Sequence, residues 1–183
     1  MSIGRTRLLA IAFVIAAAVA ATATGSAAVA SGEDSFGGNS LRERLTGYEE
    51  DPQTISTAGS GTVVLQVNRA KQEITYRLSY TGLEGAVTQA HIHFGGRAQS
   101  GAVVVFLCTN LGNGPAGTQA CPPAPATITG TIRPGDVLTA GTSGITAGQF
   151  DEFVAAIRAG VTYANVHSMM WPGGEIRAQL GHH

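Results

Sequence analysis

The sequence predicts an all-β protein with one short helix. Threonine, valine and glycine make up much of the chain, and 25 of the 183 residues are glycine. Charged residues account for 13%, against roughly 25% in an average soluble domain. This composition is typical of short strands joined by tight turns, with hydroxyl and amide groups rather than charges on the surface.

Seven segments carry strand patterns. Between residues 71 and 80, the apolar residues Ile74, Tyr76 and Leu78 alternate with polar ones, which places all apolar side chains on one face of a strand. A sheet with one dry face and one polar face is typical of antiparallel pairing. The segments expected to form strands are Gly61–Val67, Lys71–Tyr80, Val87–Phe94, Ala102–Leu107, Ala126–Ile132, Val161–Ser168 and Glu175–Leu180.

One segment, Thr146–Gly160, has helical spacing instead. Acidic residues stand early in it and Arg158 stands late, which suits the two ends of a helix dipole. Gly160 is a natural C-terminal stop. Its apolar residues, which recur every three or four positions, are Phe150, Phe153, Val154 and Ile157. We therefore expect a short amphipathic helix across one end of the sheet structure.

The N-terminus resembles an export signal. Residues 1–30 contain two arginines, then an apolar run, then small residues, which is the layout of a secretory signal peptide. The apolar run, residues 8–21, is shorter than the roughly 20 residues of a membrane-spanning helix, so no permanent membrane span is expected after cleavage. We predict a signal peptide at 1–30, a flexible leader at 31–40, one domain at 41–181, and a secreted, extracytoplasmic protein.

Charge and cysteine content narrow the function classes. After residue 30 the chain has nine basic and twelve acidic residues, so nothing attracts nucleic acid. Cys108 and Cys121 are the only cysteines. In an exported chain they predict one structural disulfide, which is favoured over two thiolates on a metal because no histidine lies between or beside them.

The histidines of the domain follow two predicted strands. In residues 89–94, alternation sends Ala90, Ile92 and Phe94 into the core and leaves His91 and His93 on the polar face. In residues 163–168, the same alternation places His167 on the polar face beside Asn165 and Tyr163. If the two strands are neighbours, three imidazoles share one patch facing solvent. Three nitrogen donors suit copper or zinc.

A second interpretation of these histidines needs no metal. Glu175 and Arg177 are two apart on the last predicted strand, so both lie on one face and can join a polar network with the imidazoles. Met169 and Met170 offer thioether ligands for Cu(I), although a Met-Met-Trp stretch is more often apolar cover at the rim of a sheet. The acidic run at residues 49–51 is interpreted as a solvated loop.

These segments resemble the CHRD family, the chordin-type domain found in bacterial secreted proteins. The matching stretches are LTGYEEDPQTISTAGSGTVVLQV, ITYRLSYTGLEGAVTQAHIHFG, GAVVVFL and YANVHSMMWPGGEIRAQL, which together span nearly all of residues 41–180. The resemblance implies an immunoglobulin-like antiparallel β-sandwich or barrel whose HIH and NVH segments are its signature, and it implies no established activity. The Cys108–Cys121 loop and the segment 146–160 depart from the family pattern.

The sequence therefore favours a secreted, non-enzymatic binding module. Its expected partner is an extracellular protein, a glycan or a metal ion, bound through the face that holds His91, His93 and His167. One alternative is a copper-binding protein or a copper enzyme similar to superoxide dismutase, although the histidine and aspartate cluster of that family's zinc loop is missing. Another alternative is a structural protein of the cell envelope.

Overall fold

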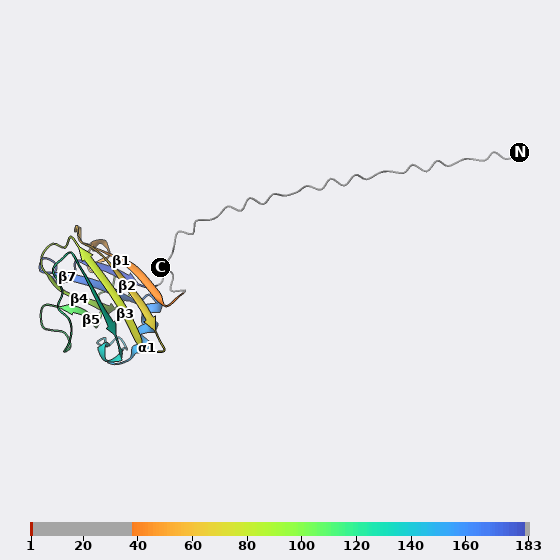
Figure 1. Cartoon of the computed structure of the whole chain (residues 1–183). Helices are drawn as coiled ribbons and strands as arrows, with labels where there is room; N and C mark the ends of the chain where they lie inside the picture. Colours follow the sequence, from red (N-terminus) through yellow and green to blue (C-terminus); the bar gives the residue numbers. More distant parts are fainter. Residues whose placement is uncertain (2–37, 182–183) are drawn as a thin grey trace. The chain divides into compact units, whose positions relative to one another are not determined.

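A computed structural model of the chain describes Met1 and residues 38–181. The predicted signal peptide and most of the predicted leader lie outside these residues. The described part is mainly antiparallel β-sheet with one α-helix and two short 3-10 turns, η1 (Gly47–Glu49) and η2 (Pro134–Asp136) (Figure 1). Its strands are β1 (Ser40–Thr46), β2 (Ser60–Asn68), β3 (Glu73–Thr81), β4 (Val87–Phe94), β5 (Ala102–Thr109), β6 (Ala126–Ile132), β7 (Thr162–Ser168) and β8 (Ile176–Leu180).

The eight strands form one curved sheet that nearly closes into a barrel. Their order is β5-β4-β7-β8-β1-β2-β3-β6, and every neighbouring pair is antiparallel. Side chains connect the two ends of this sheet: Tyr76 Oη on β3, the strand next to edge strand β6, donates to the carbonyl of Leu107 on edge strand β5 at 2.9 Å. Gln119 Nε2 donates to the carbonyls of Leu107 and Thr129. The predicted all-β fold with one helix is confirmed.

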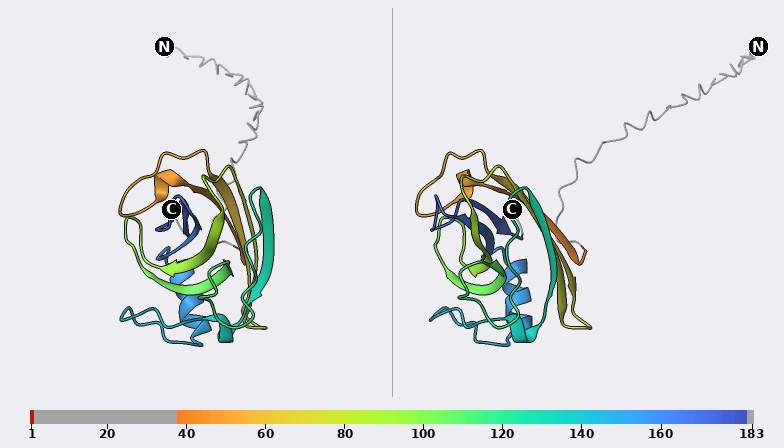
Figure 2. Two further views of the ribbon diagram at one scale, coloured as in Figure 1. Left: turned by 90° about the vertical axis from the view of Figure 1, so that its left-hand side faces the viewer. Right: turned by 60° about the vertical axis from the view of Figure 1, so that its left-hand side comes forward.

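The core lies inside this barrel. The strand residues predicted to point inward are buried there, including Ile74 and Leu78 of β3 and Ile92 of β4. The helix α1 (Phe150–Arg158) lies at one end of the curved sheet (Figure 2) and buries its apolar stripe against the same core. Its buried residues are Phe150, Phe153, Val154, Ala156 and Ile157.

Strand β1 is not among the seven strands that the sequence predicts. Leu41 and Leu45 of this strand are buried, but Glu43 occupies the position between them and interrupts the apolar alternation. This segment forms a strand because it pairs with β2, a long apolar strand that needs a neighbour on each side. Such long-range pairing cannot be seen in the local pattern of residues. Strand β1 completes the link between β2 and β8.

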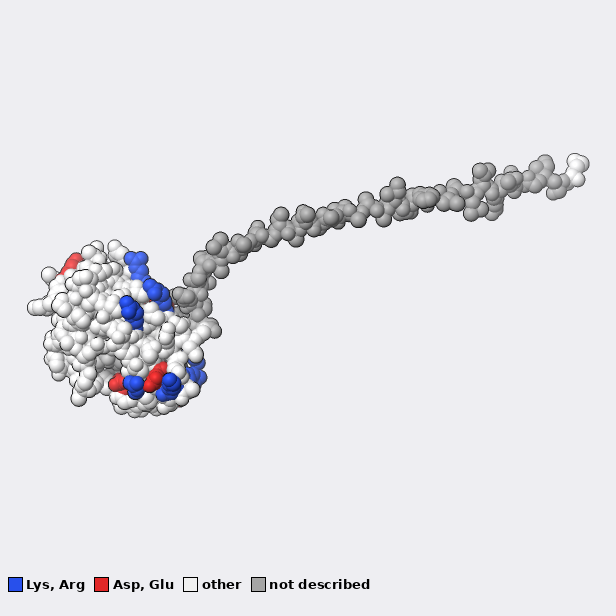
Figure 3. All heavy atoms as spheres, in the orientation of Figure 1, with Lys and Arg blue, Asp and Glu red and all other residues white. Residues whose placement is uncertain are grey.

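Two further predictions concern the surface and the cysteines. Cys108 and Cys121 form the predicted disulfide, with an S–S distance of 1.99 Å. Charged side chains are sparse on the face shown in Figure 3, where uncharged residues cover most of the area. No helix within the described residues is long and apolar enough to cross a membrane.

Candidate metal centre

Strands β4 and β7 are direct neighbours, and their register brings the three histidines to one face. His91 pairs with Asn165, His93 with Tyr163, and Gln89 with His167. Residues that pair across a ladder point to the same side of the sheet. The core side is taken by Ala90, Ile92, Ala164 and Val166. The condition stated for the histidine patch, that these two strands are neighbours, is therefore met.

The imidazoles are close enough to share one ion. His91 Nδ1 lies 3.2 Å from His167 Nε2. Across the set, one ligand atom from each of the three histidines lies within 4.8 Å of the other two. Two nitrogens bound to one tetrahedral Zn²⁺ at about 2.0–2.1 Å stand roughly 3.3 Å apart. The His91 Nδ1–His167 Nε2 contact has a similar length, but in the metal-free protein it is a hydrogen bond, and it leaves Nε2 as the unpartnered atom of His91.

The face that holds the histidines is buried, which corrects the expectation that it faces solvent. The exposed fractions are 2% for His91, 8% for His93 and 5% for His167. Loop residues that follow β4 and β7 bond directly to the imidazoles and lie over the face. Alternation along a strand separates the core face from the other face, but it gives no information about loops that fold back over that other face.

Two backbone carbonyls fix the protonation of the rings. His93 Nδ1 donates to the carbonyl of Gly101 at 2.8 Å, and His167 Nδ1 donates to the carbonyl of Pro172 at 2.9 Å. A carbonyl only accepts, so Nδ1 carries the proton and the neutral rings present a bare Nε2. Histidine ligands of metals are commonly oriented through the second ring nitrogen in this way.

The imidazole nitrogens that face the site have few hydrogen-bond partners. The Nε2 atoms of His91 and His93 are buried without a hydrogen-bond partner. Asn165 Oδ1 lies 3.1 Å from His167 Nε2, so an oxygen faces a nitrogen that bears no proton. A rotation of the amide, or a cation held by both atoms, makes this contact attractive.

Burial keeps the three rings neutral. It lowers the pKa of His91 to about 3, with further lowering from the neighbouring His167 and His93. It lowers the pKa of His93 to about 4 and also lowers the pKa of His167. A buried charge is costly, so the uncharged form dominates at neutral pH. Neutral imidazole is the form that binds a metal.

Arg177 and Tyr163 form a stack with His93. The His93 ring is parallel to the Tyr163 ring, with 4.7 Å between centroids and 5° between planes. The guanidinium of Arg177 lies 3.5 Å from the centroid of the same Tyr163 ring. Arg177 is 1% exposed, and it donates to the carbonyls of Gly96 and Gln99.

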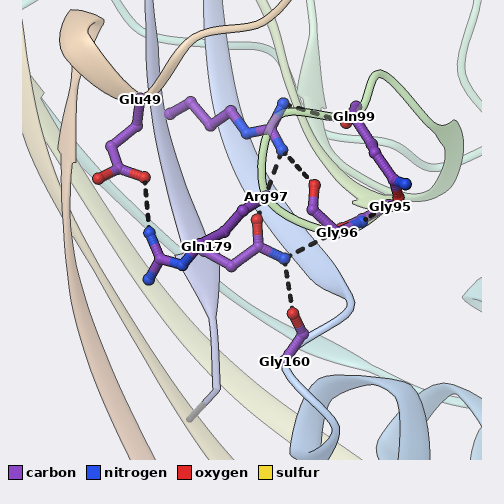
Figure 4. A network of polar contacts seen from close by, with 8 residues as sticks. Glu49, Gly95, Gly96, Arg97, Gln99, Gly160 and Gln179 are labelled. Carbon is purple, nitrogen blue, oxygen red and sulfur yellow. Dashed lines mark hydrogen bonds and ion pairs between the residues drawn. The ribbon is translucent and has the colours of Figure 1, made fainter. Parts of the chain in front are cut away.

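The loop after β4 is tied down by a polar network. Gln179 Nε2 donates to the carbonyls of Gly95 and Gly160, and Arg97 pairs with Glu49 (Figure 4). Together with the bonds from Arg177, these contacts hold the loop whose Gly101 carbonyl orients His93. The network therefore supports one of the three imidazoles indirectly.

The Glu175 carboxyl bonds to Thr57 and Glu84 and not to the histidines. Its Oε1 accepts from the Thr57 hydroxyl at 2.6 Å and from the backbone N–H of Glu84 at 2.8 Å. No hydrogen bond joins Glu175 or Arg177 to an imidazole among the described residues, so the direct polar network expected for these side chains is not formed. Of the two, only Arg177 approaches the histidines, through the Tyr163 ring.

Glu50 is a buried residue of this region that the sequence does not identify. It was assigned to a solvated acidic loop, but it is buried, and burial raises its pKa to about 8 against the opposing effect of Arg177. A Cβ added to Gly174 would lie 2.7 Å from Glu50 Oε1 and 2.9 Å from Asn165 Nδ2, so this carboxyl and this amide flank the same glycine. Glu50 follows η1, and no local pattern in the sequence separates it from its exposed neighbour Glu49.

A family model described as the CHRD domain matches residues 41–180. The chain belongs to the CHRD domain family. No curated protein and no solved structure matches it significantly. In this CHRD domain the HIH segment lies on β4 and the NVH segment lies on β7, so the two segments that carry the resemblance also supply all three imidazoles of the cluster.

Proposed function

We propose that this CHRD domain is an exported binding module that holds a transition-metal ion through His91, His93 and His167. The observation that carries the proposal is the pair of buried, unpartnered Nε2 atoms beside a third neutral imidazole. An unsatisfied buried polar atom costs roughly 1–3 kcal/mol. A bound ion gives these lone pairs a partner.

The donor set limits the choice of ion to metals that accept nitrogen ligands. Imidazole suits copper and zinc, whereas magnesium and calcium take oxygen ligands. Two of the rings are already oriented by backbone carbonyls, which reduces the ordering that binding requires. Copper and zinc are therefore the ions that this donor set fits best.

Metal titration of the secreted protein by calorimetry tests the proposal. Because His182 and His183 end the chain, the protein should be a variant that lacks both residues, so that a terminal histidine pair contributes no binding heat. We expect one ion per chain. The matched control is the His91→Gln, His93→Gln double variant, checked for folding by circular dichroism. Equal binding by the folded double variant would contradict the proposal.

A further inference from the structure

Resting on this proposed function, we infer that the histidine centre selects monovalent copper over divalent zinc, with Met169 and Met170 as the surface point that captures the ion. The inference names the ligand of the same site. It follows from the charge of the donor set, from a fixed positive charge beside it, and from two exposed thioethers on the adjoining turn.

The donor set is uncharged. Within the described residues, the clustered ligand atoms come from histidines alone, with no carboxylate or thiolate among them. A bound ion therefore keeps its full charge inside a site where each ligand is at most 8% exposed. The solvation cost of burying an ion grows with the square of its charge, so it is about four times larger for a divalent ion than for a monovalent ion of equal size.

A fixed positive charge stands close to the centre. Arg177 lies over the Tyr163 ring, and His93 is stacked on that ring. Strand β7 carries Tyr163 between β4 and β8, so the guanidinium and the imidazole reach the ring from neighbouring strands on opposite sides. No salt bridge within 4.0 Å involves Arg177 in the part of the chain that the structure describes, although its charge acts on the nearby buried Glu50 carboxyl. Its charge repels a divalent ion twice as strongly as a monovalent one.

The turn after β7 presents two soft ligands to solvent. Met169 is 70% exposed and Met170 is 61% exposed. They come after His167 and Ser168 in the chain, and the same turn supplies the Pro172 carbonyl that orients His167. Thioethers bind Cu(I) and are poor ligands for zinc. Two adjacent thioethers beside a buried nitrogen centre thus offer an entry point specific to the monovalent ion.

Competition titrations test the selectivity. The variant without His182 and His183 is titrated with Cu(I) under anaerobic conditions against bathocuproine disulfonate, and with Zn(II) against a chromophoric zinc chelator. We expect Cu(I) to bind at least roughly a hundredfold more tightly than Zn(II). If neither ion binds, the proposed function is wrong. If zinc binds as tightly as Cu(I), the proposed function stands and the inferred selectivity is wrong.

Variants separate the two parts of the inference. Arg177→Met should raise zinc affinity by a larger factor than Cu(I) affinity, whereas Arg77→Met, on an exposed position of β3, should change neither.

The Met169→Leu, Met170→Leu variant should take up Cu(I) several-fold more slowly in stopped flow, with equal final Cu(I) occupancy and unchanged zinc uptake. Unchanged Cu(I) uptake in this variant would remove the capture point. The wild-type affinity ratio remains decisive if Arg177→Met fails to fold.

Discussion

His93 and His167 each have one nitrogen fixed by the backbone and one directed into the site. The carbonyls of Gly101 and Pro172 hold the Nδ1 protons, so the bare Nε2 atoms exist before any ion arrives. Burial then disfavours the imidazolium form. The three rings thus resist protonation in the folded protein but not in the unfolded chain.

This difference predicts that the metal-free protein loses stability in acid. The folded-state pKa values of His91 and His93 are about 3 and about 4, against 6.5 for an ordinary histidine. As the pH falls below 6.5, the unfolded chain takes up protons that the folded protein refuses, so the free energy of unfolding decreases. Urea denaturation at pH 7 and pH 5 measures the loss. The His91→Gln, His93→Gln variant should show a weaker dependence, and an equal slope in both proteins would contradict the assignment.

Glu50 predicts a pH dependence of the opposite sign between pH 4.5 and about 8. Its folded-state pKa of about 8 exceeds the ordinary value of 4.5, so the folded protein keeps a proton that the unfolded chain has lost. Stability from this group is therefore lost as the pH rises through this window. Glu50→Gln should be more stable than wild type at pH 8.5, by up to about 5 kcal/mol, and should match it near pH 4.5. Parallel stability curves for the two proteins would argue against a buried, protonated Glu50.

At the scale of elements, the turn between β7 and β8 closes over the site. Gly174 has a φ of +130°, and a Cβ there would approach the Glu50 carboxyl and the Asn165 amide to less than 3 Å. Gly173, the residue before it, has nothing within 4 Å of the same added atom. The turn therefore has room for a side chain at Gly173 and none at Gly174.

The pair of glycines gives a matched test of this packing. Gly174→Ala should lower the free energy of unfolding by about 1–3 kcal/mol, because the backbone is strained and the added methyl displaces Glu50 or Asn165. It should also weaken metal binding. Gly173→Ala should leave both quantities within about 0.5 kcal/mol of wild type. Thermal denaturation and calorimetry on the two variants give the comparison, and similar effects at both positions would contradict the packing described.

The sequence predicts an element well where the pattern of residues within that one segment determines its structure, and poorly where contacts with distant segments determine it. Alternation identified seven strands and placed His91 and His93 on one face, and helical spacing identified α1. Glu43 concealed β1 because one charged residue breaks a short alternation. The burial of the histidines and of Glu50 was beyond prediction, since it comes from loops far away in sequence that fold over the sheet.

At the scale of the whole molecule, the disulfide and the edge contacts keep the barrel nearly closed. Cys108 lies at the end of β5, and its bond to Cys121 fixes the loop that carries Gln119 toward β6. Replacing both cysteines by serine should lower the free energy of unfolding by about 3 kcal/mol, as expected for a loop of this length. Chemical denaturation with and without the disulfide measures this, and a loss below 0.5 kcal/mol would mean that the loop holds its place unaided.

The barrel also explains how a polar site is kept from water. Strands β4 and β7 present apolar side chains to the core and imidazoles to the other face, and the loops after both strands cover that face. The most direct test of a metal centre there is anomalous X-ray scattering at the copper edge from crystals of the copper-loaded protein. A single peak among His91, His93 and His167 is predicted. A peak elsewhere on the chain, with none between these rings, would contradict the account.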